Sequence, residues 1–117
     1  MSEALDGIDG NWKIIDYPPH PECVGCEFKI NNESPNKYRL YAHVVNGMNC
    51  TLEYNPENNE WKTSPLMSTL MAGPPEKMKK ESFISDLISH INFVQTEDEQ
   101  YVIIQTNDSA TARLERI

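Results

Sequence analysis

Three side chains near the N-terminus have a spacing that suits metal binding. They form the pattern His20-x-x-Cys23-x-x-Cys26, and imidazole and thiolate groups are preferred ligands of zinc. A structural zinc site needs four ligands, and no second CxxC pair is present to complete it. The missing ligand favours the alternative, a proline-stiffened loop with two ordinary thiols. A redox role would require a helix N-terminus that lowers the thiol pKa, whereas a strand is predicted to follow.

Other residue types that support catalysis are present without a supporting arrangement. Glu53, Glu60, Glu81 and Asp86 include possible carboxylate pairs, but their spacing fixes no pair. The serines lack a G-x-S-x-G elbow, and no glycine-rich phosphate loop exists. Cys50 has no neighbouring base and is predicted to be a small buried hydrophobe. We therefore expect a non-enzymatic protein without a cofactor.

A methionine-rich stretch, 65–75, is the best candidate for a binding surface. A soft apolar group that can adapt to a partner or line a pocket is formed by Met67, Met71 and Met78 with Leu66 and Leu70. The alternative is that most of these side chains belong to the core. We expect the part that remains exposed, beside Gly73-Pro74-Pro75, to be an interaction site.

Short strands and one helix must position these residues. Alternating apolar residues predict strands at 12–17, 26–30, 37–45, 50–54, 60–62, 66–71, 101–105 and 110–117, with a possible short strand at 92–95. The dipeptide Asn46-Gly47 predicts a two-residue type I′ hairpin turn, and 31–36 is predicted to be a polar loop. These signals give an antiparallel sheet of about seven or eight strands.

The only amphipathic helix is predicted over 76–91. Ile84, Leu87, Ile88 and Ile91 follow the spacing of one helical face, and Pro75 suits the first helical position. This helix must cover one face or plug an open end of the curled sheet. The predicted fold class is α+β, a barrel-like antiparallel sheet with one packed helix. Residues 1–9 are predicted to be a flexible N-terminus and 10–117 a single domain.

Charge and composition restrict the partners. The chain of 117 residues carries a formal net charge of −8, which disfavours nucleic-acid binding. No segment approaches the ~20 apolar residues of a transmembrane helix. The acidic N-terminus is unlike a signal peptide, and an odd number of cysteines suits free thiols. We expect a cytoplasmic protein.

Several segments together resemble the META domain family, which includes bacterial HslJ-like proteins and small proteins of protozoan parasites. The matching segments are 46–54 (NGMNCTLEY), 65–73 (PLMSTLMAG), Glu81 in the helix, Gly10 with Trp12, and Leu114 with Arg116. The resemblance implies an antiparallel barrel-like α+β fold and no established catalytic residues. Members of the family are linked to stress response, secretion or virulence.

Two functions follow as expectations. The first is a protein-interaction or adaptor role, and the second is carriage of a small apolar or lipid ligand inside the barrel. Inward-facing aromatic residues motivate the second: Trp12, Tyr38, Tyr54 and Trp61. The candidate ligand or partner surface consists of Leu66, Met67, Ser68, Thr69, Met71, Gly73 and Glu81.

Overall fold

The computed structural model describes residues 8–69 and 71–117. Residues 1–7 of the predicted N-terminal segment, and Leu70 of the methionine-rich stretch, lie outside this range. The secondary-structure elements are β1 (Gly10–Asp16), the 3-10 helix η2 (Pro21–Cys23), β2 (Glu27–Ser34), β3 (Lys37–His43), β4 (Gly47–Asn55), β5 (Glu60–Thr63), β6 (Met67–Ser68), α1 (Pro75–Ser89), β7 (Ile91–Glu97), β8 (Tyr101–Thr106) and β9 (Thr111–Arg116).

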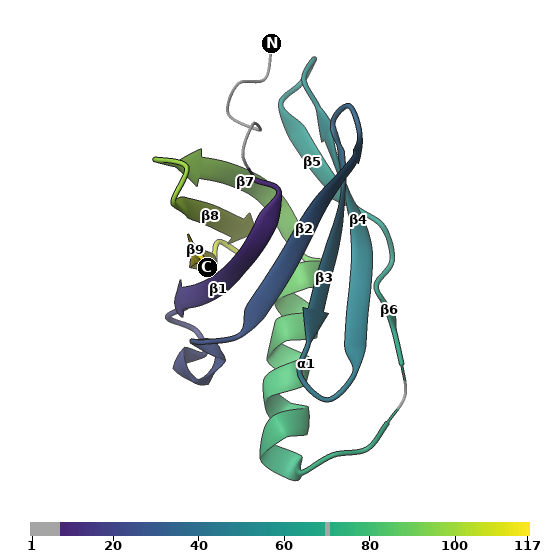
Figure 1. Ribbon diagram of the computed structural model, residues 1–117, viewed down its shortest axis with the longest axis vertical. Helices are drawn as coiled ribbons and strands as arrows, with labels where there is room; N and C mark the ends of the chain where they lie inside the picture. Colours follow the sequence, from purple (N-terminus) through teal and green to yellow (C-terminus); the bar gives the residue numbers. More distant parts are fainter. Residues whose placement is uncertain (1–7, 70) are drawn as a thin grey trace.

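The strands form one antiparallel sheet that curls into a nearly closed barrel (Figure 1). Neighbouring strands follow the order β5-β4-β3-β2-β1-β9-β8-β7, and β6 pairs with β4 outside this path. The two ends of the order meet, since β5 contacts β7. The predicted fold class, an α+β curled barrel with one packed α-helix, is confirmed.

The core is formed by buried side chains that alternate with exposed ones along the strands. In β3, Tyr38, Leu40 and Ala42 are buried, while the residues between them are exposed. Such alternation is expected of strands with one solvated face. Trp12 and Ile14 in β1 point into the same core, as predicted.

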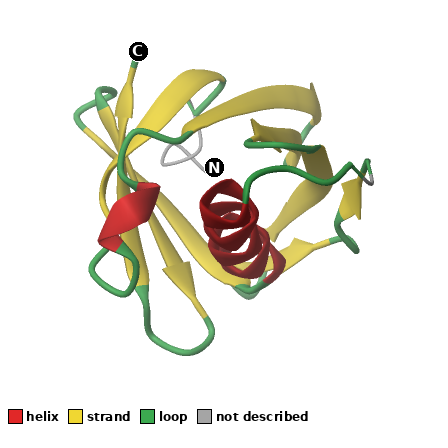
Figure 2. Ribbon diagram, turned by 90° about the horizontal axis from the view of Figure 1, so that it is seen from below, coloured by secondary structure: helices red, strands yellow, loops and turns green. Residues whose placement is uncertain are grey.

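Helix α1 lies where the curling sheet leaves an opening, so that the strands curve around it (Figure 2). Ile84, Leu87 and Ile88 face the core. The helix ends at Ser89 rather than at Ile91, because Ile91 already pairs with Thr106 of β8. Within the described residues, no helix combines the length and apolar character needed to cross a bilayer.

Strand β2 is longer than predicted. Residues 31–34, expected in a loop, pair with β3 through Asn31 opposite Arg39 and Asn32 opposite Tyr38. The side chain of Asn32 donates hydrogen bonds to the carbonyl oxygens of Ser34 and Lys37. Backbone pairing with β3 therefore keeps these polar residues in the strand. Conversely, the strand predicted at 66–71 contracts to the two residues of β6.

Two residues before β1 also contact the domain. The indole Nε1 of Trp12 donates a 2.9 Å hydrogen bond to the carbonyl of Ile8, which is buried. The carboxylate of Asp9 accepts a 2.7 Å bond from the backbone N–H of Asn32. Ile8 and Asp9, assigned from the sequence to the N-terminal segment, thus pack against the domain.

Candidate functional site

A side-chain network joins the β3–β4 connection to α1. The carboxylate of Glu81 accepts hydrogen bonds from the backbone N–H of Val45 at 2.9 Å and of Asn46 at 2.6 Å. Its second oxygen accepts a 2.8 Å bond from Nδ2 of Asn46. Both Asn46 and Glu81 are buried. A buried carboxylate is stable only when its oxygens are satisfied in this way.

The same asparagine holds the methionine-rich segment. Oδ1 of Asn46 accepts hydrogen bonds from the Thr69 hydroxyl at 2.8 Å and from the Met71 N–H at 2.6 Å. Nδ2 of Asn46 also donates to the Met71 carbonyl at 3.1 Å. The Thr69 N–H donates to the carbonyl of Gly47 at 3.2 Å. One buried amide therefore bonds both the side-chain hydroxyl of Thr69 and the backbone of Met71.

The predicted Asn46-Gly47 turn is wrong. Strand β3 ends at His43 and β4 begins at Gly47, so the connection is 44–46. A type I′ turn needs positive φ at both central residues, and neither Asn46 nor Gly47 has it. The inward position of the Asn46 side chain, bonded to Glu81, accounts for the different loop.

Gly73 packs closely against Val45 because it has no side chain. A Cβ atom at this position would lie 2.8 Å from Cγ2 and 3.0 Å from Cγ1 of Val45. These separations are shorter than van der Waals contact, so the chain approaches Val45 more closely than a residue with a side chain allows. Both the Glu81 network and the Gly73 contact therefore involve the loop of residues 44–46.

Two opposing effects set the pKa of Glu81. Burial, the larger single effect, raises it, but the hydrogen bonds from Asn46 and Val45 and the nearby His43 together lower it below its ordinary value. The carboxylate is therefore held in its ionised form. Glu81, which was assigned from the sequence to the candidate surface, has its carboxylate inside this buried network.

The remaining candidate surface residues divide into exposed and covered groups. Met67 is 67% exposed and Met71 is 55% exposed, whereas Leu66 packs partly against the core. Ser68 is exposed, and the hydroxyl of Thr69 is used by Asn46. Among the described residues of this segment, Met67 and Met71 are the large apolar side chains that face outward.

The His20, Cys23 and Cys26 side chains have separate environments. The His20 ring stacks on Phe83 with 3.5 Å between ring centroids. Cys23 is buried in the core, and burial raises the pKa of its thiol to about 11, while Cys26 is half-buried. Among the described residues, no three His, Cys, Asp or Glu side chains are arranged to hold a metal ion.

The inward aromatic residues belong to the packed core. Trp12, Tyr38 and Trp61 are buried. The Trp61 ring lies 6.3 Å from that of Tyr38 and 5.1 Å from that of the partly buried Tyr54, measured between centroids. These separations are those of interacting aromatic pairs.

Comparison with known proteins supports the fold. No protein-family model matches the sequence, and no curated protein matches it. The solved NMR structure of a protein from Burkholderia xenovorans is similar, with a TM-score of 0.60 and 14% sequence identity over 93% of this chain and 82% of that chain. At this identity the similarity extends to the fold alone.

Proposed function

We propose that the protein is a non-enzymatic, META-type interaction domain that binds a protein partner through the surface of residues 65–73. The observation that carries the proposal is the exposure of Met67 and Met71 on a segment that Asn46 holds in place. Exposed methionines offer polarisable side chains that adapt to a partner's apolar residues.

The hydrogen bonds that hold the candidate surface in place favour binding of a protein partner. Thr69, Met71 and Gly73 are already held by Asn46 and by the contact with Val45. They lose little conformational freedom when a partner binds, which preserves more of the contact energy. Among the described strands, β6 has β4 as its only neighbour, so its other edge is available for pairing with an extended segment. We therefore propose a partner that adds an extended, apolar segment beside β6.

The alternative function, carriage of an apolar ligand inside the barrel, has less support. The aromatic residues that motivated it pack against one another and against the core. A catalytic role likewise lacks support from Glu81, whose carboxylate is occupied by structural hydrogen bonds. The proposal places the protein in the cytoplasm, supported by its three free cysteines, and links it to the stress, secretion or virulence processes of the META family.

Photo-crosslinking tests the proposal. A photoreactive phenylalanine replaces Met67 in the full chain, and Ile117, which is 61% exposed, receives the same replacement as the control. We expect irradiation in a cell extract to give a discrete adduct from position 67 and not from position 117, and Met71→Glu to remove that adduct. Equal labelling from both positions would show that exposure alone drives capture and would overturn the proposal.

A further inference from the structure

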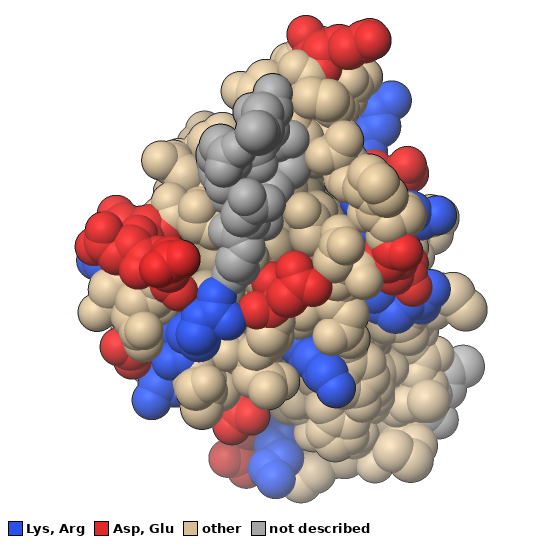
Figure 3. All heavy atoms as spheres, turned by 45° about the horizontal axis from the view of Figure 1, so that its top comes forward, with Lys and Arg blue, Asp and Glu red and all other residues tan. Residues whose placement is uncertain are grey.

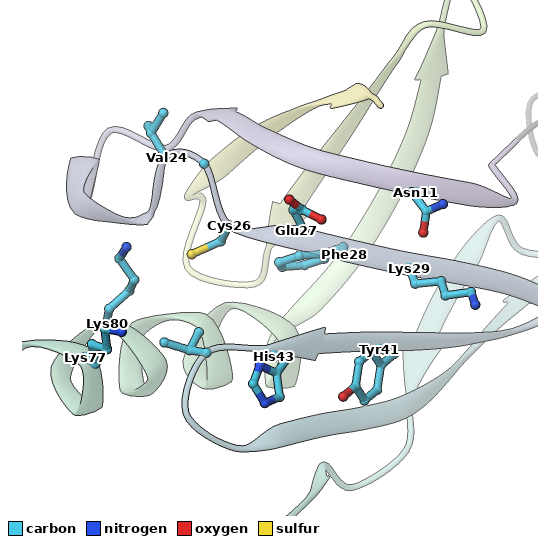
Figure 4. A pocket seen from close by; sticks show the side chains of 12 residues that line it. Asn11, Val24, Cys26, Glu27, Phe28, Lys29, Tyr41, His43, Lys77 and Lys80 are labelled. Carbon is cyan, nitrogen blue, oxygen red and sulfur yellow. The ribbon is translucent and has the colours of Figure 1, made fainter. Parts of the chain in front are cut away.

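A groove of about 590 Å³ opens on the outside of the barrel. The loop after η2, strands β2 and β3, and the first half of α1 form its walls (Figure 4). Its volume falls in the range of small-molecule sites, about 300–1,000 Å³. The groove is separate from the proposed protein-binding surface, because none of the described residues 65–69 and 71–73 lines it.

Unpaired positive charge lines this groove. Lys29, Lys77 and Lys80 reach it from β2 and α1, and none of the three forms an ion pair with a residue in 8–69 or 71–117. The single acidic side chain among its lining residues is Glu27, which lies opposite Lys13 of β1 in the sheet register. On the face shown in Figure 3, by contrast, acidic and basic side chains are interspersed. In a chain of net charge −8, three unpaired lysines around one groove indicate an anionic ligand.

One of these lysines occupies an unfavourable helix position. Lys77 lies in the first turn of α1, at the positive end of the helix dipole, where cations are disfavoured, and Lys80 lies one turn further along the helix. A bound anion would relieve this repulsion and be attracted by both ammonium groups and the dipole. In Figure 4 the Lys80 side chain and the Cys26 sulfur extend into the space between α1 and the start of β2.

The groove also has apolar and aromatic walls. Tyr41 is 41% exposed, although it is a large aromatic residue, and Val24 is 47% exposed. The sheet register places Tyr41 beside Lys29 on the outer face, and the partly buried Val44 also lines the groove. In Figure 4, Val24 and Lys80 lie at one end of the groove and Tyr41 and Lys29 at the other. The ring of a ligand can therefore lie against Val24 while its charged group meets Lys80.

We propose that this groove binds a small aromatic carboxylate, with the carboxylate between Lys77 and Lys80 and the ring against Val24 and Val44. This site is independent of the proposed protein-binding surface. Both features of the ligand are required: the anion matches the unpaired lysines, and the planar apolar body matches the exposed walls between them.

A titration followed by amide chemical shifts tests the proposal in the full chain. The probe is 3-phenylpropionate, and the neutral 3-phenylpropanamide and inorganic phosphate are the comparison compounds. We expect saturable shifts with the carboxylate at amides of 24–29 and 41–44, and binding at least about fivefold weaker with the amide or with phosphate. The carboxylate should also slow alkylation of Cys26, the least buried of the three thiols.

Two charge variants identify the site. K77Q/K80Q should weaken binding of 3-phenylpropionate about five- to tenfold. K37Q/K62Q removes the same charge from exposed positions outside the groove and should change the affinity less than about twofold. Unchanged amide chemical shifts away from the substituted positions verify that both variants are folded. Absence of saturable binding, equal affinity for the amide or phosphate, or equal effects of the two variants would each overturn the proposal.

Discussion

The carboxylate of Glu81 and the side-chain amide of Asn46 lie 2.8 Å apart and are both buried. Through this bond, the helix and the β3–β4 loop fix each other. The same asparagine binds Thr69 and Met71. A single buried pair thus connects α1 to the segment whose methionines face outward.

Removing the Glu81 carboxylate should destabilise the domain. Glu81→Ala leaves the N–H groups of the half-buried Val45 and the buried Asn46 without this acceptor, and each such loss costs about 1–3 kcal/mol. We expect the free energy of unfolding, measured by urea denaturation, to fall by about 3 kcal/mol. Glu81→Gln keeps one oxygen acceptor and should cost less. Glu76→Gln, an exposed change on the same helix, should cost under about 0.5 kcal/mol. Equal effects at positions 76 and 81 would contradict the network.

Stability should depend on pH through Glu81. Because its folded-state pKa lies below the ordinary value of 4.5, the ionised group adds stability that is fully present above the unfolded pKa. That contribution is lost as the pH falls through the folded-state value. The difference in unfolding free energy between the wild type and Glu81→Gln should therefore shrink as the pH falls from about 6 to about 3. A constant difference across this range would show that the charge of Glu81 contributes nothing.

Asn46→Ala should release the methionine-rich segment locally. The N–H of Met71 donates to Oδ1 of Asn46, whereas the N–H of Thr69 donates to the carbonyl of Gly47. Hydrogen exchange should therefore accelerate at Met71 by at least about tenfold and less at Thr69. The amide of Val102 in the core of β8 serves as the reference. Equal acceleration at all three amides would indicate global destabilisation and no specific attachment.

Gly73→Ala should strain the contact with Val45. The added Cβ would lie 2.8 Å from a valine methyl, and valine has little rotamer freedom to move away. We expect a loss of about 1–2 kcal/mol in unfolding free energy. In a Val45→Ala background the methyl groups are absent, so the same substitution should cost clearly less. Additive effects of the two changes, measured by a double-mutant cycle, would rule out the close approach.

Local sequence patterns predicted the buried faces correctly where the period of apolar side chains determines the structure. The alternation of Tyr38, Leu40 and Ala42 predicted the inward face of β3, and the spacing of Ile84, Leu87 and Ile88 predicted the buried face of α1. These periods follow directly from strand and helix geometry. The curled α+β architecture followed from them.

Long-range contacts explain what the sequence did not reveal. Asn46-Gly47 has the composition of a type I′ turn, but Asn46 bonds to Glu81, which is 35 positions away. One signal was available: Glu81 shares a helix face with apolar residues, and a carboxylate in such a place needs partners. The groove combines residues from four separate segments, so no local spacing marks it.

The affinity of the partner captured through position 67 tests the proposed function most directly. The purified partner is titrated calorimetrically into the wild type, Met67→Glu and the exposed control Ile117→Glu. Burial of Met67 in the interface predicts at least about tenfold weaker binding by Met67→Glu and less than about twofold change for Ile117→Glu. Equal dissociation constants for all three proteins would contradict a binding surface at residues 65–73.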